Sequence, residues 1–342
     1  VGSEMCIRDR IITGEYTYNR TDTHYQFYSD RFRFADVQLA AKNSTEKGQD
    51  FYRMYDTTAK YNALNVFSNY EHTWGNHAFK AMLGFNQEEY YYRYFYGNVL
   101  AQATPSVPSF EGGTGEKKII DKYSEYAIRS GFARFNYVYA DKYLFELNGR
   151  YDGSSKFPKD NRFGFFPSVS AGWRLGQEKF MSASKSWLDD LKLRVSYGTV
   201  GNQRIDPYQF TPTMSVNSAG TYILDAGGKT TYITSPGLVS SSFTWEKVTT
   251  FNVGCDLYAF NNQLNATFDW YNRKTTGMLA AGIEIPKVVG TTAPLQNVAD
   301  MKNQGWELSV AWRSNVGNLN YRIGLNAVSY THLRAHETLR YL

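Results

Sequence analysis

In the stretch RFGFFPSVSAGWRL, from Arg162 to Leu175, the side chains alternate in size and polarity along the sequence. Its odd-numbered positions from Phe163 onward are mostly large and apolar, whereas its even-numbered positions are mostly small or polar. A β-strand points successive side chains to opposite faces, so this period of two predicts a strand with one apolar and one polar face. The stretch also exceeds the roughly five or six residues of an ordinary strand, which favours a long ribbon.

The same alternation recurs along most of the chain, and helical spacing explains none of its occurrences. It is found at 77–85, 143–151, 191–197, 264–270, 306–312 and 319–325. We count about twelve such strands between Ile11 and Val328, and the strands before Asn62 have the least regular pattern. The predicted fold is therefore all-β, with neighbouring strands antiparallel because tight turns join them.

The connections between these strands alternate between tight turns and longer loops. Tight turns are predicted at Gly75-Asn76, Ala140-Asp141, 260–262 and 315–318. Longer connections are predicted at 93–122, 152–161, 201–244 and 276–304, and the connection at 176–189 has room for a short helix. Such sorting is typical of outer-membrane β-barrels, in which short turns lie on one side of the membrane and long loops on the other.

Composition excludes several other classes of protein. Aromatic residues make up 17% of the 342 residues and charged residues only 20%, which is the opposite of a disordered chain. No stretch approaches the roughly 18 consecutive apolar residues of a spanning helix, so any membrane segment must be a strand. The net charge of +5 is not gathered in a basic run, so we expect no nucleic-acid partner. Aromatic residues crowd predicted strand ends, at 90–96 and at Trp245 and Tyr258, as in membrane-interface girdles.

Both ends of the chain lack the pattern of the interior. Residues 1–10 (VGSEMCIRDR) and 329–342 (SYTHLRAHETLRYL) resemble sequencing-adaptor DNA translated into protein, and we interpret them as artefacts. Setting them aside leaves 11–328 as the predicted barrel segment. It also removes His332 and His336, an i,i+4 pair that lacks the glutamate which a zinc helix places after its first histidine.

Five motifs of the interior resemble a single family. The stretches DLKLRVSYGTVGNQRIDPY (190–208) and DKYLFELNGRYDGSSKF (141–157) are similar to signatures of the SusC/RagA-like TonB-dependent transporters of Bacteroidota. The stretches at 162–180, 245–279 and 297–310 resemble the same family, in the same order. The resemblance implies a transport protein of the cell outer membrane, with a transmembrane β-barrel of about 22 strands and an N-terminal plug domain.

The resemblance also implies partners for the complete protein. They are a SusD-like surface lipoprotein that captures an oligosaccharide or peptide substrate, the TonB-ExbB-ExbD complex that supplies energy, and the outer membrane lipid. About twelve strands cannot close a barrel of about 22, so we expect an incomplete wall without the plug. Such a wall has two unpaired edges, and we expect it neither to insert nor to transport alone.

Two alternatives stay open at this point. The first is a TonB-dependent receptor for a siderophore or vitamin, which would share the wall. The second is a soluble or surface β-sandwich that binds or hydrolyses carbohydrate. A sandwich would bury Trp173 and Trp270 between two packed sheets, whereas a barrel wall would turn both rings outward.

Few residues suggest a chemical site, and we expect neither an enzyme nor a cofactor. Asp256 and Asp269 lie on neighbouring predicted strands and could act as the two acids of a glycosidase, but a polar wall explains them as well. The interior histidines are His24, His72 and His77. The last two flank the predicted turn at Gly75-Asn76, and a position at the barrel rim explains them better than a metal site.

Aromatic loop residues are the candidates for substrate contact, because sugar rings stack on aromatic faces. The predicted contacts are Tyr94, Tyr96, Tyr222, Tyr232 and Phe243. The motif GNQRIDPY, at 201–208, is instead predicted to be structural, with Pro207 fixing a turn.

Overall fold

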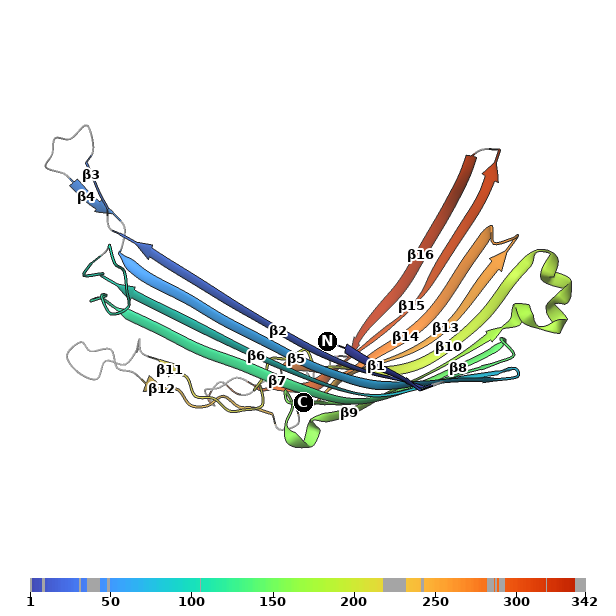
Figure 1. Cartoon of the computed structure of the whole chain (residues 1–342), viewed down its shortest axis with the longest axis horizontal. Helices are drawn as coiled ribbons and strands as arrows, with labels where there is room; N and C mark the ends of the chain where they lie inside the picture. The colour runs from blue at the N-terminus through green and yellow to red at the C-terminus, as the bar shows by residue number, and fades with distance from the viewer. Residues whose placement is uncertain are drawn as a thin grey trace. The chain divides into compact units, whose positions relative to one another are not determined.

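The structure is a computed structural model of the chain, and long strands dominate it (Figure 1). It describes residues 2–7, 10–30, 32–35, 44–47, 50–104, 106–217, 232–240, 243–281, 286, 288, 293–317 and 319–335. Within these residues, twelve strands form one sheet in the order β1-β2-β5-β6-β7-β8-β9-β10-β13-β14-β15-β16. The sheet is therefore a meander, as the tight turns predict.

The strands of this sheet are long, and several exceed the predicted lengths. Their bounds are β1 (Gly2–Ile7), β2 (Arg10–Ser29), β5 (Phe51–Trp74), β6 (His77–Leu100), β7 (Lys117–Tyr139), β8 (Tyr143–Ser154), β9 (Phe163–Arg174), β10 (Leu188–Asn202), β13 (Glu246–Ala259), β14 (Leu264–Ala281), β15 (Leu295–Val316) and β16 (Leu319–Ala335). Two short hairpins lie within loops, β3 (Phe32–Ala35) with β4 (Ser44–Lys47) and β11 (Val216–Asn217) with β12 (Tyr232–Ile233). Three 3-10 helices lie in connections: η1 (Lys159–Asn161), η2 (Leu175–Gln177) and η3 (Lys179–Ser186).

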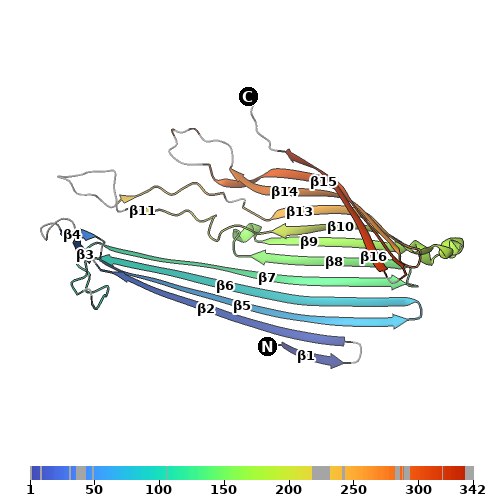
Figure 2. The ribbon, with the colours of Figure 1, turned by 90° about the horizontal axis from the view of Figure 1, so that it is seen from above.

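The chain divides into two compact units. The first comprises Glu15–Leu64 and Gln87–Ala127, and the second comprises Gly2–Gly14, Asn65–Asn86 and Ile128–Leu342. Strands β8, β9, β10, β13 and β14 of the second unit run side by side (Figure 2). The features described below belong to the second unit unless stated otherwise.

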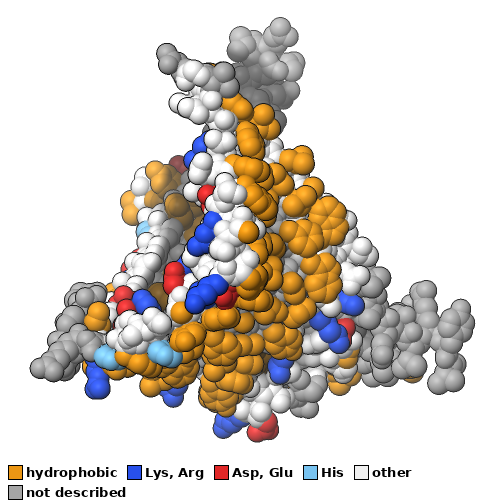
Figure 3. All heavy atoms as spheres, turned by 90° about the vertical axis from the view of Figure 1, so that its right-hand side faces the viewer, with side chains coloured by type: hydrophobic (Ala, Val, Ile, Leu, Met, Phe, Trp, Pro, Cys, Tyr) orange, Lys and Arg blue, Asp and Glu red, His pale blue; other side chains and the backbone are white. Residues whose placement is uncertain are grey.

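The apolar face of the sheet is open to the surroundings. Trp173 and Trp270 are 37% and 38% exposed, so neither ring is buried under another layer. The same face carries further exposed apolar side chains: Phe145, Leu147, Phe165, Val195, Val253, Phe268 and Trp306. Hydrophobic side chains gather in a broad patch on one side of the molecule (Figure 3). The β-sandwich alternative is therefore wrong, because the other sheets within the described residues have only two strands each.

Tight turns on one edge of the sheet use backbone conformations that ordinary residues rarely adopt. Ala140 and Asp141 have φ values of 50° and 59° between β7 and β8, and 260–262 have φ values of 55° to 61° between β13 and β14. Positive φ at both central residues matches the turn to the twist of the strands that it joins. The connection at 175–187 contains η2 and η3, which confirms the short helix predicted there.

Neighbouring connections on this edge are also bonded to one another. Backbone N–H to O distances are 2.7 Å from Ala140 to Asn76, 2.8 Å from Arg174 to Lys142, 2.7 Å from Phe260 to Trp187 and 2.8 Å from Arg313 to Gln263. We name this edge the turn edge. At the turn edge, hydrogen bonds therefore connect each hairpin to the next one near the ends of their strands.

The opposite edge of the sheet carries the longer connections, and we name it the loop edge. The strands end at different residues there than the sequence predicts. In the first unit, strand β6 continues to Leu100 and β7 begins at Lys117, so the loop predicted at 93–122 is shorter. Strands β14 and β15 likewise extend to Ala281 and from Leu295, into the loop predicted at 276–304. Hydrogen bonding to a neighbouring strand extends these ribbons beyond the region where side-chain alternation is regular. Among the described residues, no helix is both long and apolar enough to cross a bilayer.

Candidate functional site: the polar face and its loop-side end

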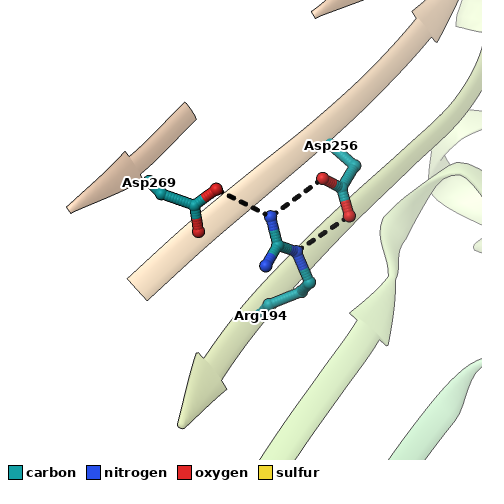
Figure 4. Close-up of polar contacts among 3 residues, drawn as sticks. All are labelled: Arg194, Asp256 and Asp269. Atoms are coloured by element: carbon teal, nitrogen blue, oxygen red, sulfur yellow. Dashed lines mark hydrogen bonds and ion pairs between the residues drawn. The ribbon is translucent and has the colours of Figure 1, made fainter. Parts of the chain in front are cut away.

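The polar face of the sheet is centred on Arg194 of β10. Its Nε donates to Asp256 Oδ2 at 2.8 Å, and one terminal nitrogen donates to Asp256 Oδ1 at 2.9 Å and to Asp269 Oδ2 at 3.2 Å (Figure 4). Gly254 lies directly opposite both Arg194 and Asp269. A Cβ at Gly254 would collide with the guanidinium and with the Asp269 carboxylate. The glycine therefore lets one arginine cross a strand and bind two carboxylates.

Ion pairs and amide hydrogen bonds continue this polar face across β7, β8 and β9. Arg134 Nε donates to Asn148 Oδ1 at 2.8 Å, and the Asn148 amide donates to Glu146 at 2.6 Å and to Ser168 at 3.3 Å. Arg150 donates to Asp152 at 2.6 Å. The face therefore presents matched charges and amides, which suits contact with water or a polar solute.

A shallow hollow of about 530 Å³ lies on this face. Its polar lining side chains come from strands β6 to β10 and β13: Lys80, Asn136, Glu146, Lys192, Arg194 and Asn252. Charged groups of both signs and amides line it together with apolar surface, as at Ala78 and Leu144, so its lining is mixed in polarity.

Asp256 and Asp269 both accept hydrogen bonds from one guanidinium, and this shared partner explains their proximity. Among the described residues, no cluster of three or more His, Cys, Asp and Glu side chains could hold a metal ion. His72 and His77 each stack with Trp74, and their ring centroids lie 5.6 Å and 5.7 Å from that of Trp74. They belong to an aromatic ladder near the turn edge.

At the loop side, a small aromatic core anchors the connections. Phe157, Phe166, Phe243 and Trp245 are each at most 6% exposed, and Ile205 and Leu279 pack against them. We name these six residues the loop-anchoring cluster. The indole Nε1 of Trp245 also donates to the Arg162 carbonyl at 2.9 Å. The girdle role predicted for Trp245 is therefore wrong, because its ring is buried against Phe157 of a connection and Phe166 of β9.

Asn297 of β15 ties the end of the long 203–245 connection to the sheet. Its Oδ1 accepts from Thr244 N at 3.0 Å, and its Nδ2 donates to Thr244 O at 2.9 Å and to Gly277 O at 2.6 Å. The motif at 201–208 enters the same assembly through Ile205. Its predicted structural role thus has a physical basis, since it packs the start of the connection against the residues that hold its end.

At the turn edge, Glu178 binds together the ends of two of the family motifs. Its carboxylate accepts hydrogen bonds from Tyr143 OH at 2.7 Å, Lys142 Nζ at 3.0 Å and Trp173 Nε1 at 3.2 Å. Asp141 and Arg174 pair beside it at 2.7 Å. Donation from Tyr143, then from Lys142 and Trp173, lowers the pKa of Glu178 below its usual value. We name these contacts the Glu178 knot.

The structure places the predicted substrate contacts in different settings. Tyr94 and Tyr96 lie in β6 within the first unit, where the Tyr96 ring is 4.9 Å from that of Tyr55. Tyr232 lies in the short strand β12, and Phe243 is 2% exposed within the loop-anchoring cluster. Tyr222 lies outside the described residues. Substrate contact at these residues stays a prediction.

Sequence reasoning missed the partners that join distant segments. Alternation places Arg194 and Asp256 on polar faces, but they are 62 residues apart, and strand register makes them neighbours. In the Glu178 knot, Glu178 likewise binds Tyr143 and Lys142, which precede it by 35 and 36 residues. The sequence signal for this contact was that both partners lie in family motifs, at 141–157 and 162–180.

A long antiparallel meander with an exposed apolar face and a charge-matched polar face defines the wall of a membrane β-barrel. A family model described as TonB dependent receptor-like, beta-barrel, matches residues 7–341. The chain belongs to this family of TonB-dependent receptor barrels, and it is part of an outer-membrane protein.

Individual relatives agree with this assignment. TonB-dependent receptor SusC of Bacteroides thetaiotaomicron is 34% identical over 271 residues, which are 74% of this chain and 25% of that protein. TonB-dependent receptor P26 of Formosa agariphila is 36% identical over 230 residues, 64% of this chain and 23% of that protein. The RagAB peptide importer in its closed-closed state shares the fold with a TM-score of 0.82 at 24% identity, over 97% of this chain and 35% of that chain.

The chain thus spans about a quarter of the length of these curated relatives. The relatives are named as receptors or importers. Strand β16 continues past Ser329 to Ala335. The assignment of 1–10 and 329–342 to adaptor sequence stays a prediction.

Proposed function

We propose that this segment is part of the wall of an outer-membrane importer that takes up a glycan or a peptide. The observation that carries the proposal is the contrast between the two faces of one sheet: exposed tryptophans on one and the Arg194 network on the other. Lipid suits the first face and a wet interior suits the second. The relationship to SusC and the fold shared with RagAB support import as the function.

Partners of the complete protein follow from the same relationship. A SusD-like surface lipoprotein would deliver the substrate at the loop edge, where the loop-anchoring cluster holds the connections in place. The TonB-ExbB-ExbD complex would supply energy through a part of the protein outside this chain. The polar face then acts by lining the path, and the cargo crosses without a bond being broken.

A deletion strain tests this proposal. The gene for the complete receptor is deleted and restored, and uptake of fluorescent oligosaccharides, fluorescent peptides and a ferric siderophore is measured in cells. We expect deletion to abolish uptake of one oligosaccharide or peptide class, and the internal cargo to be intact by mass spectrometry. Loss of siderophore uptake alone would instead establish the alternative receptor.

Co-purification tests the partner separately. An affinity tag on the complete receptor should retain a SusD-like lipoprotein through mild detergent washes. Retention of TonB alone, with full substrate uptake in a strain that lacks the lipoprotein, would contradict this part of the proposal.

A further inference from the structure

Three lysines lie on the apolar face at its loop-side border. Lys274 of β14 is directly opposite Lys302 of β15, and Lys247 of β13 is opposite Thr276. Residues directly opposite each other in an antiparallel pair share a face. Lys274 and Lys302 are each four residues from Trp270 and Trp306, an even spacing, so they lie on the face of those tryptophans. We name Lys247, Lys274 and Lys302 the outward lysine cluster.

The order of side chains along this face is graded. Trp270 and Trp306 form one opposed pair, Asn272 and Gln304 form the next on the same face, and Lys274 and Lys302 form the one after that. The face therefore changes from aromatic to amide to ammonium within two steps of the pleat. This is the order in which acyl chains, interface and charged headgroups follow one another in a bilayer.

Strand geometry places the lysines at the border of the apolar band. Leu264, at the turn edge, and Lys274 are ten residues apart, or about 34 Å along a strand at roughly 3.4 Å per residue. A barrel strand tilted by about 40° would cover about 26 Å of membrane in that length, close to the roughly 25 Å height of an apolar band. The lysines thus lie at the headgroup level on the loop side.

Positive charge at this border exceeds the negative charge beside it. Asp300 lies 3.6 Å from Lys274 Nζ, and its other carboxylate oxygen accepts from Gly277 N at 3.1 Å. Like charges directly opposite each other destabilise a strand pair. Among the described residues of this border, one carboxylate faces three ammonium groups, so the opposed lysines can accommodate a further anion. All three lysines are exposed, and the side chain of Lys274 is 59% exposed.

We propose that the outward lysine cluster binds the phosphate group of a lipid in the loop-side leaflet of the outer membrane. Continuity with the lipid-facing tryptophans places a headgroup there, and the excess of ammonium groups selects an anionic one. Lysine stems lie along apolar surface while their ammonium groups reach the headgroup layer. A phosphate between Lys274 and Lys302 would offset their mutual repulsion, so the bound lipid would also stabilise the β14-β15 pair.

Lipid binding to the purified complete receptor tests this proposal. The probe is diphosphorylated lipid A in detergent micelles, compared with the same lipid after enzymatic removal of its phosphates, and binding is measured by native mass spectrometry. The test variant replaces Lys247, Lys274 and Lys302 with Gln. A matched variant replaces three other exposed lysines, Lys159, Lys179 and Lys185, with Gln and loses the same net charge.

We expect the wild type to prefer the phosphorylated lipid. The test variant should bind this lipid at least roughly tenfold more weakly than the wild type, and the matched variant should be unchanged. The single variant Lys302→Gln should lose about fivefold, and it serves if the triple variant does not fold. Equal binding of phosphorylated and dephosphorylated lipid would overturn the proposal, as would wild-type affinity in the test variant. Displacement of the lipid by millimolar inorganic phosphate would show that the lysines take any phosphate, and would overturn the assignment to lipid.

Discussion

Arg194 shows how much of the polar face depends on a single side chain. It supplies the positive charge that Asp256 and Asp269 share, and it reaches both because Gly254 leaves the space between them open. The side chains of this trio are 20% to 33% exposed. Water can therefore screen the pair in part, which places its strength between that of buried and surface ion pairs.

Replacing Arg194 with Met should destabilise the complete receptor by on the order of 1–2 kcal/mol, because two close carboxylates lose their common partner. The midpoint of urea unfolding in detergent measures the change. Arg204→Met, at an exposed loop arginine, is the matched control and should leave the midpoint unchanged. Equal effects from the two variants would show that the network adds no stability.

The Glu178 knot should make stability depend on pH in the acid range. Because the pKa of Glu178 is lowered from 4.5 on folding, its contribution is complete above about pH 4.5 and is lost as pH falls through the lower folded pKa. We expect Glu178→Gln to lower the unfolding temperature at pH 7 and to narrow its difference from the wild type below pH 4.5. Glu116→Gln, at an exposed loop glutamate, should track the wild type at every pH. A constant difference across this range would contradict the role of the charged carboxylate.

At the scale of the strand, alternation was enough to assign faces but insufficient to assign lengths. The apolar face of β9 follows directly from 162–175, and its exposure confirms the barrel-wall interpretation. Strands β5 and β6 are each 24 residues long. Strand β6 extends well beyond the alternating stretch at 77–85, because pairing continues where the side chains no longer alternate regularly. Partners such as Arg194 and Asp256 depend on register across a long connection, which no local pattern encodes.

Burial of loop residues was equally inaccessible to sequence reasoning. Phe243 and Trp245 look like surface aromatics in a polar connection, yet they are 2% and 4% exposed. Their burial depends on Phe157 and Phe166, which lie far away in the sequence on another connection and strand.

The turn between β7 and β8 offers a test of backbone strain. Ala140 has a φ of 50°, a conformation that costs an L-residue roughly 1–2 kcal/mol relative to glycine. Ala140→Gly should therefore stabilise the receptor by up to about 1 kcal/mol, measured as a higher urea midpoint, after the greater freedom of glycine in the unfolded chain is included. Ala133→Gly, in the interior of β7, should have the opposite effect. Destabilisation by both variants would contradict this turn geometry.

The assignment of the two faces can be tested on adjacent residues of β13. Val253 is 42% exposed on the apolar face, and Asn252 lines the hollow on the polar face. In a background in which Cys6 and Cys255 are both replaced with Ala, a fluorophore on Val253→Cys should be strongly quenched by lipids with spin-labelled acyl chains. The same fluorophore on Asn252→Cys should be quenched little. Equal quenching at the two positions would contradict a wall with lipid on one side.

At the scale of the whole molecule, the sheet of the described residues ends on β1 at one side and on β16 at the other. Each of these strands has one neighbour in the sheet, so each presents an unpaired row of backbone groups. Unpaired edges are excluded from hydrocarbon, because every unsatisfied N–H and C=O group there costs several kcal/mol. The relatives, of which this chain covers about a quarter, have further chain with which such edges could pair.

Residues 11–328 expressed alone should therefore fail to form a membrane-inserted barrel. We expect no protease-resistant band whose gel mobility changes on heating, whereas the complete receptor should give one under the same conditions. A resistant, heat-modifiable band from the isolated segment would contradict this expectation and would show that the segment closes on itself or with other copies.

Backbone hydrogen bonds join neighbouring connections along the turn edge, and they affect how the sheet resists a pulling force. A pull on one hairpin is passed to the next through Ala140 and Asn76, or through Phe260 and Trp187, before any strand pair has to separate. A load on one hairpin is thereby shared with its neighbours through hydrogen bonds that lie outside the strand pairs themselves.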